Sequence, residues 1–187
     1  MTIPGSCIPW IKKQRTQYKK DVVKEFIADI ENDFNQIKPF LPAEALDILD
    51  IGCGVGGIDV LLAKFYGCPM LDLLDSNIET PLYYGYKKEA ACYNSFEATA
   101  DLMESNGIFA FNLIDKNDGV PEKEYDIVIS LLSMGYHYPI DTYKFKTKCF
   151  IADVREGTDG LEKLLNAYPV VNVIAEQNKA QRVVCYA

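Results

Sequence analysis

The stretch that decides the fold of this chain is Ile48-Leu49-Asp50-Ile51-Gly52-Cys53-Gly54-Val55-Gly56-Gly57. Leu46–Ile51 is a short apolar run typical of a buried strand, and the turn after it holds four glycines within six residues. Apolar residues with helical spacing come next, at Ile58, Leu61, Leu62 and Phe65, before a C-capping Gly67. This order predicts a ligand site, because glycine lets backbone approach a ligand and the helix N-terminus carries positive partial charge.

Strands continue to alternate with helices along the chain. Apolar runs predict further strands at Met70–Asp75, Ile108–Leu113, Tyr125–Leu131 and Cys149–Val154. The expected helices are Val22–Ile37, one that starts at Phe96 and is capped by Asn106-Gly107, and one opened by a capping box, Asp159-x-x-Glu162. Because parallel neighbours need a long crossover, strands that are separated by helices are expected to be parallel.

The last two strands differ from the others. Val170–Ala175 and Arg182–Tyr186 face each other across a short connection that leaves no room for a helix. A connection of this length predicts an antiparallel hairpin. The sequence therefore predicts an α/β fold, a parallel sheet that ends in one reversed strand.

Length and charge narrow the class of protein. The chain has 187 residues, which suits a single domain, and we expect residues 1–42 to form a helical extension packed on it or capping it. The net charge is −8, but residues 1–24 hold six basic side chains against Asp21, a balance of +5 that leaves −13 elsewhere. So acidic a body repels polyphosphate, and nucleic acid is not an expected partner.

The sequence carries no signal for export, for membrane insertion or for a metal site. No apolar run approaches the roughly 20 residues that span a bilayer, and the N-terminus does not read as a signal peptide. We therefore expect a cytoplasmic protein that binds no membrane. The six cysteines are scattered and His137 is the single histidine, so no metal is expected.

The glycine-rich turn is compatible with two kinds of cofactor. Gly52-x-Gly54-x-x-Gly57 satisfies the dinucleotide fingerprint and Asp75 lies near the spacing of a ribose-binding acid, so an NAD-dependent oxidoreductase is one alternative. Asp50, directly before the turn, would repel a pyrophosphate but attract the sulfonium and ammonium groups of S-adenosylmethionine. The terminal hairpin, which an NAD-binding half-domain does not require, favours the second cofactor.

The stretch Ile48–Gly57 resembles motif I of the class I, Rossmann-like S-adenosylmethionine-dependent methyltransferases. The resemblance extends in element order from Leu46 to the C-terminus. It implies a seven-stranded sheet in the order 3-2-1-4-5-7-6, with strand seven antiparallel, helices on both faces and S-adenosyl-L-methionine as the cofactor. The hairpin deduced above agrees with this topology.

The resemblance also implies positions for the cofactor. Its methionyl part would lie along Gly52, Cys53, Gly54 and Gly56 with Asp50 nearby, and Asp75 would accept hydrogen bonds from both ribose hydroxyls, flanked by Ser76 and Asn77. Asn112 and Leu113 would flank the adenine, although Asp115 is an alternative to Asn112. Ser130 and Leu131 would close the site.

The loop after the fourth strand would face the transferred methyl group. It contains His137 between Tyr136 and Tyr138, and histidine is the side chain best suited to accept a proton near neutral pH. We expect His137 to be the general base or a residue that orients the acceptor; the alternative is a structural hydrogen bond. The amino-methylating and Pro-Cys signatures of DNA methyltransferases do not occur, which leaves a small hydroxylated acceptor, such as a sugar, as the expectation.

Three points stay open at this stage. Tyr83, Tyr84, Tyr86, Tyr93 and Asn94 could line the acceptor pocket or pack internally, and Arg15, Gln17 or Tyr18 could reach the cofactor carboxylate. A homo-oligomer or a partner subunit could complete the pocket. A non-catalytic regulator that binds the cofactor is the alternative to an enzyme, since it would lack the same acceptor motifs.

Overall fold

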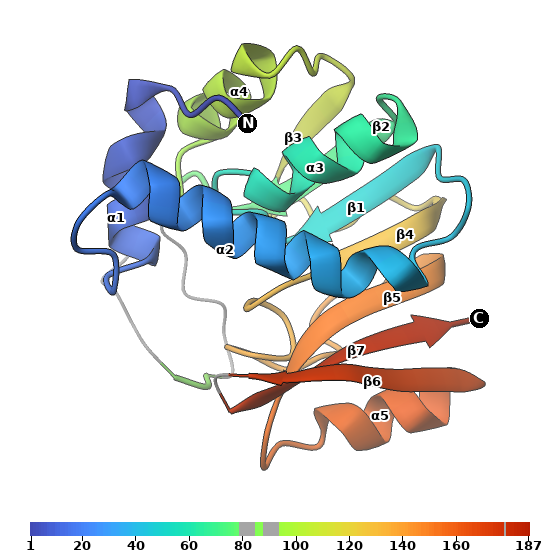
Figure 1. Ribbon diagram of the computed structural model, residues 1–187. Coiled ribbons are helices and arrows are strands. Elements are labelled where there is room, and N and C mark those ends of the chain that lie inside the picture. The colour runs from blue at the N-terminus through green and yellow to red at the C-terminus, as the bar shows by residue number, and fades with distance from the viewer. Residues whose placement is uncertain (79–84, 88–93, 178) are drawn as a thin grey trace.

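The computed structural model describes residues 1–78, 85–87, 94–177 and 179–187, and these form one mixed sheet covered by helices (Figure 1). The sheet has seven strands in the order β3-β2-β1-β4-β5-β7-β6. They are β1 (Asp47–Ile51), β2 (Met70–Asp75), β3 (Phe111–Asp115), β4 (Glu124–Ser130), β5 (Lys146–Arg155), β6 (Val170–Gln177) and β7 (Ala180–Tyr186). Strand β7 runs antiparallel to β5 and β6, whereas β1 to β5 pair in parallel. The predicted strand order and the reversed last strand are confirmed.

Helices cover both faces of the sheet, as expected. They are α1 (Ile8–Gln14), α2 (Val22–Ile37), α3 (Gly57–Tyr66), α4 (Phe96–Ser105) and α5 (Gly160–Ala167). Figure 1 shows α2, α3 and α4 on one face and α5 on the other. Alternate residues of the strands point to opposite faces, so Ile48 and Ile127 join the core under α2 and α3, while Leu49 and Val128 join the core shared with α5.

Helix α2 packs closely against the start of α3. Its N-cap is Asp21, whose carboxylate accepts a hydrogen bond from the Lys24 N–H at 3.1 Å. Phe26 and Ile30 lie on its buried face. A Cβ atom at Gly57 would lie 2.6 Å from the Phe26 ring and 2.9 Å from Ile30, so the helices can approach this closely because residue 57 has no side chain.

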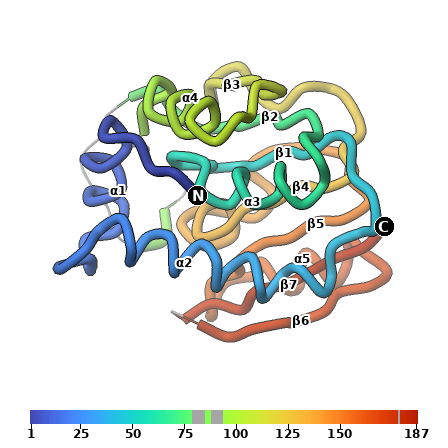
Figure 2. Tube along the Cα trace, turned by 45° about the horizontal axis from the view of Figure 1, so that its top comes forward, coloured from blue at the N-terminus to red at the C-terminus, as the bar shows by residue number. Residues whose placement is uncertain are grey.

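The N-terminal residues are fastened to the far end of α4, beside which Figure 1 places the N-terminus, and Figure 2 shows the C-terminus well apart from it. The Thr2 N–H donates to Asn106 Oδ1 at 2.9 Å, and Asn106 Nδ2 donates to the Thr2 carbonyl at 2.8 Å. The Cys7 thiol contacts the Ala98 carbonyl, also on α4. These contacts hold α1 at the end of the molecule toward which β1 points (Figure 1).

Within the described ranges, no helix has the length and apolar character that a membrane span requires.

Two boundaries differ from the sequence prediction. Strand β3 starts at Phe111 and continues to Asp115, whereas the sequence predicts Ile108–Leu113. The apolar Ile108 belongs to the end of α4, where its N–H bonds to the Met103 carbonyl at 3.0 Å after a left-handed Gly107, as in a Schellman motif. The capping box predicted at Asp159 is wrong, because its carboxylate pairs with Lys163 at 3.1 Å and does not cap α5.

A buried ion network joins α2 to the sheet. The Arg182 side chain on β7 is fully buried, and its Nε and Nη2 atoms donate to both Asp153 oxygens at 2.7 and 2.9 Å. Its Nη1 atom donates to Asp33 on α2 at 2.7 Å. Asp153 Oδ2 also accepts the Leu132 N–H at 3.2 Å, so the network reaches the loop after β4.

Substitution of Arg182 should therefore make the folded state much less stable. We expect Arg182→Met to lower the free energy of unfolding by about 3–5 kcal/mol, because it leaves two buried carboxylates without their cation. Urea denaturation measures this value, and Lys163→Gln, which breaks exposed ion pairs with Asp141 and Asp159, is the control and should change the midpoint little. An Arg182→Met protein as stable as the control would contradict the structural role of the network.

Candidate functional site

A cavity of about 760 Å³ opens at the edge where the parallel strands end. Its wall includes Asp50 and Asp75 at the ends of β1 and β2, the glycine-rich turn, the loop after β4 and Arg155 at the end of β5. One side is closed by Gln14 at the end of α1 and by Arg15 and Gln17 in the segment that follows. A volume in this range is typical of pockets that hold a cofactor or another small ligand, which are roughly 300–1,000 Å³.

The glycine-rich turn is held in place by hydrogen bonds from two other elements. The Gly54 N–H donates to Asp75 Oδ2 at 2.7 Å, and the Gly54 carbonyl accepts from the Thr99 hydroxyl at 2.9 Å and from Asn94 Nδ2. Gly54 has φ +56°, a left-handed conformation that glycine adopts without strain. The turn is thus rigid before any ligand binds, which reduces the ordering that binding requires.

The other glycines make room for neighbouring side chains. A Cβ atom at Gly52 would lie 1.8 Å from the Ser133 hydroxyl oxygen, and one at Gly56 would lie 2.6 Å from the Met103 methyl group. Gly52 therefore lets the loop after β4 approach β1, and Gly56 lets α4 approach α3. At Gly54 a Cβ would meet the Gln14 carboxamide at 3.1 Å, on the side that lines the cavity.

Three carboxyl groups gather beneath the turn. Burial raises the pKa of Asp50 well above its usual range, and the charge of nearby Asp59 adds to this increase. Burial also raises the pKa of Asp59 to about 7, against the opposing effect of a hydrogen bond with the Asp50 carboxyl group. Asp75 has a pKa of about 6, raised by burial against the opposing effect of the Ser76 and Gly54 N–H groups. Such a cluster attracts a cation and repels an anion.

The structure brings half of the predicted cofactor residues to the cavity wall. Those that line it are Asp50, Gly52, Cys53, Gly54, Asp75 and Leu131, together with His137. The wall does not include Gly56, Ser76, Asn77, Asn112, Leu113 or Ser130. Ser130 is buried, where its hydroxyl donates to the Ile51 carbonyl at 2.7 Å and accepts the Met134 N–H, and so it ties the end of β4 to β1.

Ser76 and Asn77 have local structural partners. The Ser76 hydroxyl accepts the Ile78 N–H at 3.2 Å, and Asn77 Oδ1 accepts the Phe96 N–H at 3.0 Å at the start of α4. Both residues therefore shape the chain that leaves β2. Asn77 connects that chain to the helix whose Thr99 holds the glycine-rich turn.

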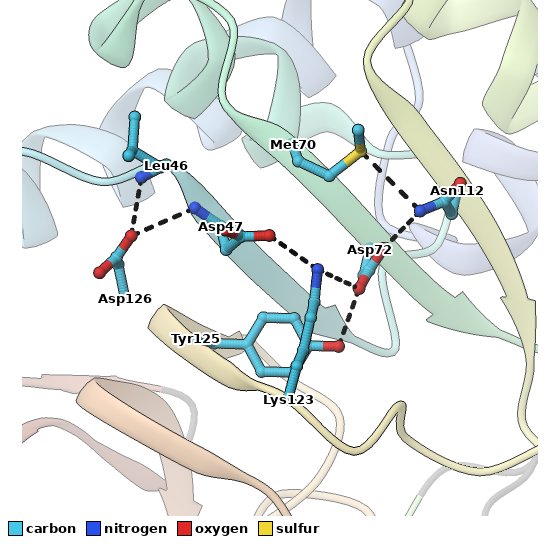
Figure 3. Close-up of polar contacts among 8 residues, drawn as sticks. All are labelled: Leu46, Asp47, Met70, Asp72, Asn112, Lys123, Tyr125 and Asp126. Atoms are coloured by element: carbon cyan, nitrogen blue, oxygen red, sulfur yellow. Dashed lines mark hydrogen bonds and ion pairs between the residues drawn. The ribbon is translucent and has the colours of Figure 1, made fainter.

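Asn112 and Leu113 lie in the middle of β3 and not at its carboxyl end, because β3 continues to Asp115 and does not end at Leu113 as the sequence predicts. Figure 3 shows Asn112 in a polar cluster on the sheet, where its Nδ2 donates to Asp72 Oδ1 at 2.8 Å. Asp72 also accepts the Tyr125 hydroxyl at 2.8 Å and pairs with Lys123 at 3.0 Å. The residue that brings the end of β3 to the cavity is Lys116.

The loop after β4 places His137 in the cavity wall as a neutral imidazole. Burial lowers its pKa, and the charge of Arg155 adds to this decrease. Its Nδ1 lies 3.1 Å from the Gly85 carbonyl oxygen, which can only accept, so Nδ1 carries the hydrogen. This bond leaves Nε2 with a lone pair, as a general base requires. The Lys87 N–H donates to the His137 carbonyl at 2.7 Å and holds the loop from the other side.

Sequence reasoning missed Arg155 and Lys179, which both line the cavity. Arg155 directly follows the predicted strand Cys149–Val154, so the sequence could have placed it at the carboxyl edge of the sheet, where the site lies. Lys179 sits in the turn between β6 and β7, and its carbonyl accepts the Glu156 N–H at 2.9 Å, which brings the hairpin to the end of β5. No local pattern predicts that contact.

The open points of the sequence prediction are resolved in part. Arg15 and Gln17 line the cavity, whereas the Tyr18 hydroxyl donates to Asp29 on α2 at 2.5 Å. Asn94 supports the glycine-rich turn. Tyr83, Tyr84 and Tyr93 lie outside the described residues. In the part of the chain that the structure describes, no three His, Cys, Asp or Glu side chains gather into a possible metal site.

Comparison with known proteins relates the chain to others through its fold. No protein-family model and no curated protein matches the sequence. A precorrin-6y C5,15-methyltransferase from Geobacter metallireducens is similar at 12% identity and a TM-score of 0.56, over 82% of this chain and 87% of that one. A putative O-methyltransferase from Nostoc punctiforme is 11% identical with a TM-score of 0.59, over 95% of this chain and 60% of that one.

TYW2 from M. jannaschii, solved in complex with AdoMet, is 18% identical with a TM-score of 0.52, over 82% of this chain and 72% of that one. At these identities the likeness lies in the fold. Together with the observed strand order, it shows that the chain has the class I, Rossmann-like fold of S-adenosylmethionine-dependent methyltransferases.

The buried carboxyl pair predicts an unusual dependence of stability on pH. The folded state raises the pKa of Asp59, so stability is full below the unfolded pKa near 4 and falls as the pH rises through about 7. Asp59→Asn, which cannot ionise, should match the wild type at pH 4 and be more stable at pH 8 by roughly 2–4 kcal/mol.

Chemical denaturation at the two pH values measures the difference, with the exposed Asp118→Asn as the control. Equal stability of Asp59→Asn and wild type at pH 8 would show that the folded state does not raise the pKa of Asp59.

Proposed function

We propose that the protein is an S-adenosylmethionine-dependent methyltransferase that acts on a hydroxyl group of a small molecule. The observation that carries this proposal is the group of buried carboxyls, Asp50, Asp59 and Asp75, under a rigid glycine-rich turn. The fold supports it, since one similar structure holds AdoMet and another is named an O-methyltransferase. The cavity, at about 760 Å³, favours a small acceptor beside the cofactor.

The carboxyl group of Asp75 suits a ribose. Each oxygen already accepts one backbone N–H, from Ser76 and from Gly54, both at 2.7 Å. A carboxylate oxygen has two lone pairs, so each can still accept a hydroxyl from a ligand in the cavity. The two N–H groups also fix the plane of the carboxylate, which orients those remaining lone pairs.

Asp50 and Asp59 distinguish between the two cofactors weighed from the sequence. A pyrophosphate at the turn would lie close to a carboxyl cluster in a buried environment, where repulsion is strong. A ligand with sulfonium and ammonium groups would instead favour the ionised carboxylates, whose pKa values the folded protein by itself raises. This argument favours S-adenosylmethionine over a dinucleotide and thus a transferase over an oxidoreductase.

The bound cofactor would supply a methyl group on a sulfonium, which is already a good leaving group. The protein must then align the nucleophile and keep water out. His137 presents the lone pair of Nε2 at the cavity wall, where it would accept the proton of an acceptor hydroxyl. Its tautomer is set by Gly85 and its loop is fixed by Lys87, so the base is oriented in advance.

The cofactor proposal predicts a large effect of Asp75. We expect Asp75→Asn to bind S-adenosylhomocysteine about tenfold more weakly or worse, because an amide can accept fewer hydroxyl hydrogen bonds than a carboxylate. In the wild type the affinity should weaken as the pH falls through about 6, where Asp75 takes up a proton. Calorimetry measures both effects.

The matched control is Asp115→Asn, since Asp115 ends the neighbouring strand in register with Asp75 but does not line the cavity. Circular dichroism checks that both variants are folded. Binding of NADH without binding of S-adenosylmethionine or S-adenosylhomocysteine would refute the proposed function.

The base predicts a separation of turnover from binding. We expect His137→Ala to lower kcat by on the order of a hundredfold and to change cofactor affinity little. Because burial lowers the pKa of His137, the wild-type rate should be level above neutral pH and fall on the acid side, and the variant should lose this acid limb.

Rates are measured with the best acceptor from a panel of hydroxylated small molecules, and Lys144→Gln, an exposed change in the chain that follows this loop, is the control. A variant with unchanged kcat would assign His137 a structural role only. Cofactor binding without transfer to any acceptor would favour a regulator.

A further inference from the structure

We propose that the acceptor carries an anionic group, a carboxylate or a phosphate, which Arg155 binds with the help of Lys179. This inference rests on the proposed function, because only a methyltransferase would bind the anion as part of a methyl acceptor. The anion site itself is a property of the cavity wall. It lies at the ends of β5 and of the β6–β7 hairpin, away from the glycine-rich turn.

The charges of the cavity are separated along the sheet. The ends of β1 and β2 contribute the carboxyls of Asp50 and Asp75, whereas the end of β5 and the hairpin contribute Arg155 and Lys179. Of the other charged residues in the wall, Asp33 is paired with Arg182 and Lys116 interacts with Asp75. Arg15 also lines the wall, directly after Gln14, the last residue of α1, which lies against Gly54 of the glycine-rich turn. One half of the cavity is therefore acidic and the half next to the loop after β4 is basic.

The side chain of Arg155 is held in one orientation. Its Nε donates to the Tyr136 carbonyl at 2.8 Å, and its guanidinium carbon lies 4.5 Å from the centre of the Tyr136 ring. Among the described residues, no carboxylate pairs with it. The Nη atoms remain to form two parallel hydrogen bonds, the geometry in which arginine recognises a carboxylate or a phosphate.

Tyr136 also connects the anion site to the base. Its ring contacts the His137 ring edge to face, with centroids 4.8 Å apart, and Arg155 lies against the same ring. Arg155 is close enough to His137 to lower its pKa. A hydroxyl at His137 and an anion at Arg155 would thus belong to one compact molecule.

Lys179, in the turn between β6 and β7, is the second cation in the basic half of the cavity. It has φ +61°, and its backbone carbonyl is fixed to the end of β5 by the Glu156 N–H. The protein carries a net charge of −8. A basic pair inside a cavity of so acidic a chain attracts an anion that the rest of the surface repels.

The first experiment measures anion binding without methyl transfer. Inorganic phosphate and benzoate, which separate the two sources of negative charge, are titrated into the S-adenosylhomocysteine-free protein and followed by ligand NMR. We expect the wild type to bind at least one of the anions saturably. The affinity for that anion should be at least about tenfold lower in Arg155→Gln and should fall less in Lys179→Gln. Lys146→Gln, an exposed change at the opposite end of β5, is the control and should bind like the wild type.

Absence of saturable binding of both anions to the wild type, or equal binding by Arg155→Gln, would overturn the anion site. The same variants are titrated with S-adenosylhomocysteine. A tenfold loss of that affinity in Arg155→Gln would also overturn the inference, because it would assign the arginine to the cofactor carboxylate. Failure of the wild type to bind this ligand contradicts the proposed function, whereas the phosphate and benzoate results stand apart from it.

The second experiment compares acceptors in matched pairs. One kind of pair is a hydroxylated acid and its uncharged amide, and the other is a sugar phosphate and the free sugar. We expect the charged member of at least one pair to have a kcat/KM about tenfold higher with the wild type and with Lys146→Gln. Arg155→Gln should lose this preference and methylate both members at similar rates. A wild type that prefers the neutral members would refute the inference.

Discussion

The structure depends on a turn in which four positions carry no side chain. Gly52 admits Ser133 of the loop after β4, Gly56 admits α4 and Gly57 admits α2, while Gly54 faces the cavity. The loop after β4, α4 and α2 can thus all pack against the turn at the end of β1, because glycine has no Cβ atom that would keep them apart. The feature that a ligand needs for close approach is the same feature that packs the protein around its site.

Charge organises the site as strongly as packing does. The acidic residues lie where β1 and β2 end, and the fixed arginine lies where β5 ends, so the order of strands in the sheet separates the two. The Arg182 network links this pattern to stability. Asp153 neutralises Arg182 and at the same time accepts the Leu132 N–H, so the ion pair that holds α2 also fixes the loop that carries His137.

Local patterns predicted elements well where a single periodicity dominated. The hairpin of β6 and β7 and the strand before the glycine-rich turn follow from their spacing. The prediction failed where an apolar or acidic residue served a neighbouring element. Ile108 reads as the start of a strand but closes α4, and Asp159 reads as a helix cap but forms an ion pair with Lys163. Both contacts are local, within five residues, so in each case two local patterns compete for the same residue.

By itself, the sequence determined the class of fold, the turn that holds the proposed cofactor and the acid at the end of β2, because each depends on residues that are adjacent or regularly spaced. Only the tertiary structure decided that Asp59 lies beside Asp50, that Asn112 turns to Asp72, and that the hairpin brings Lys179 to Glu156 at the end of β5. The members of each pair lie on different strands, helices or turns. Their contacts arise from strand order and register, which bring side chains together without any local signal.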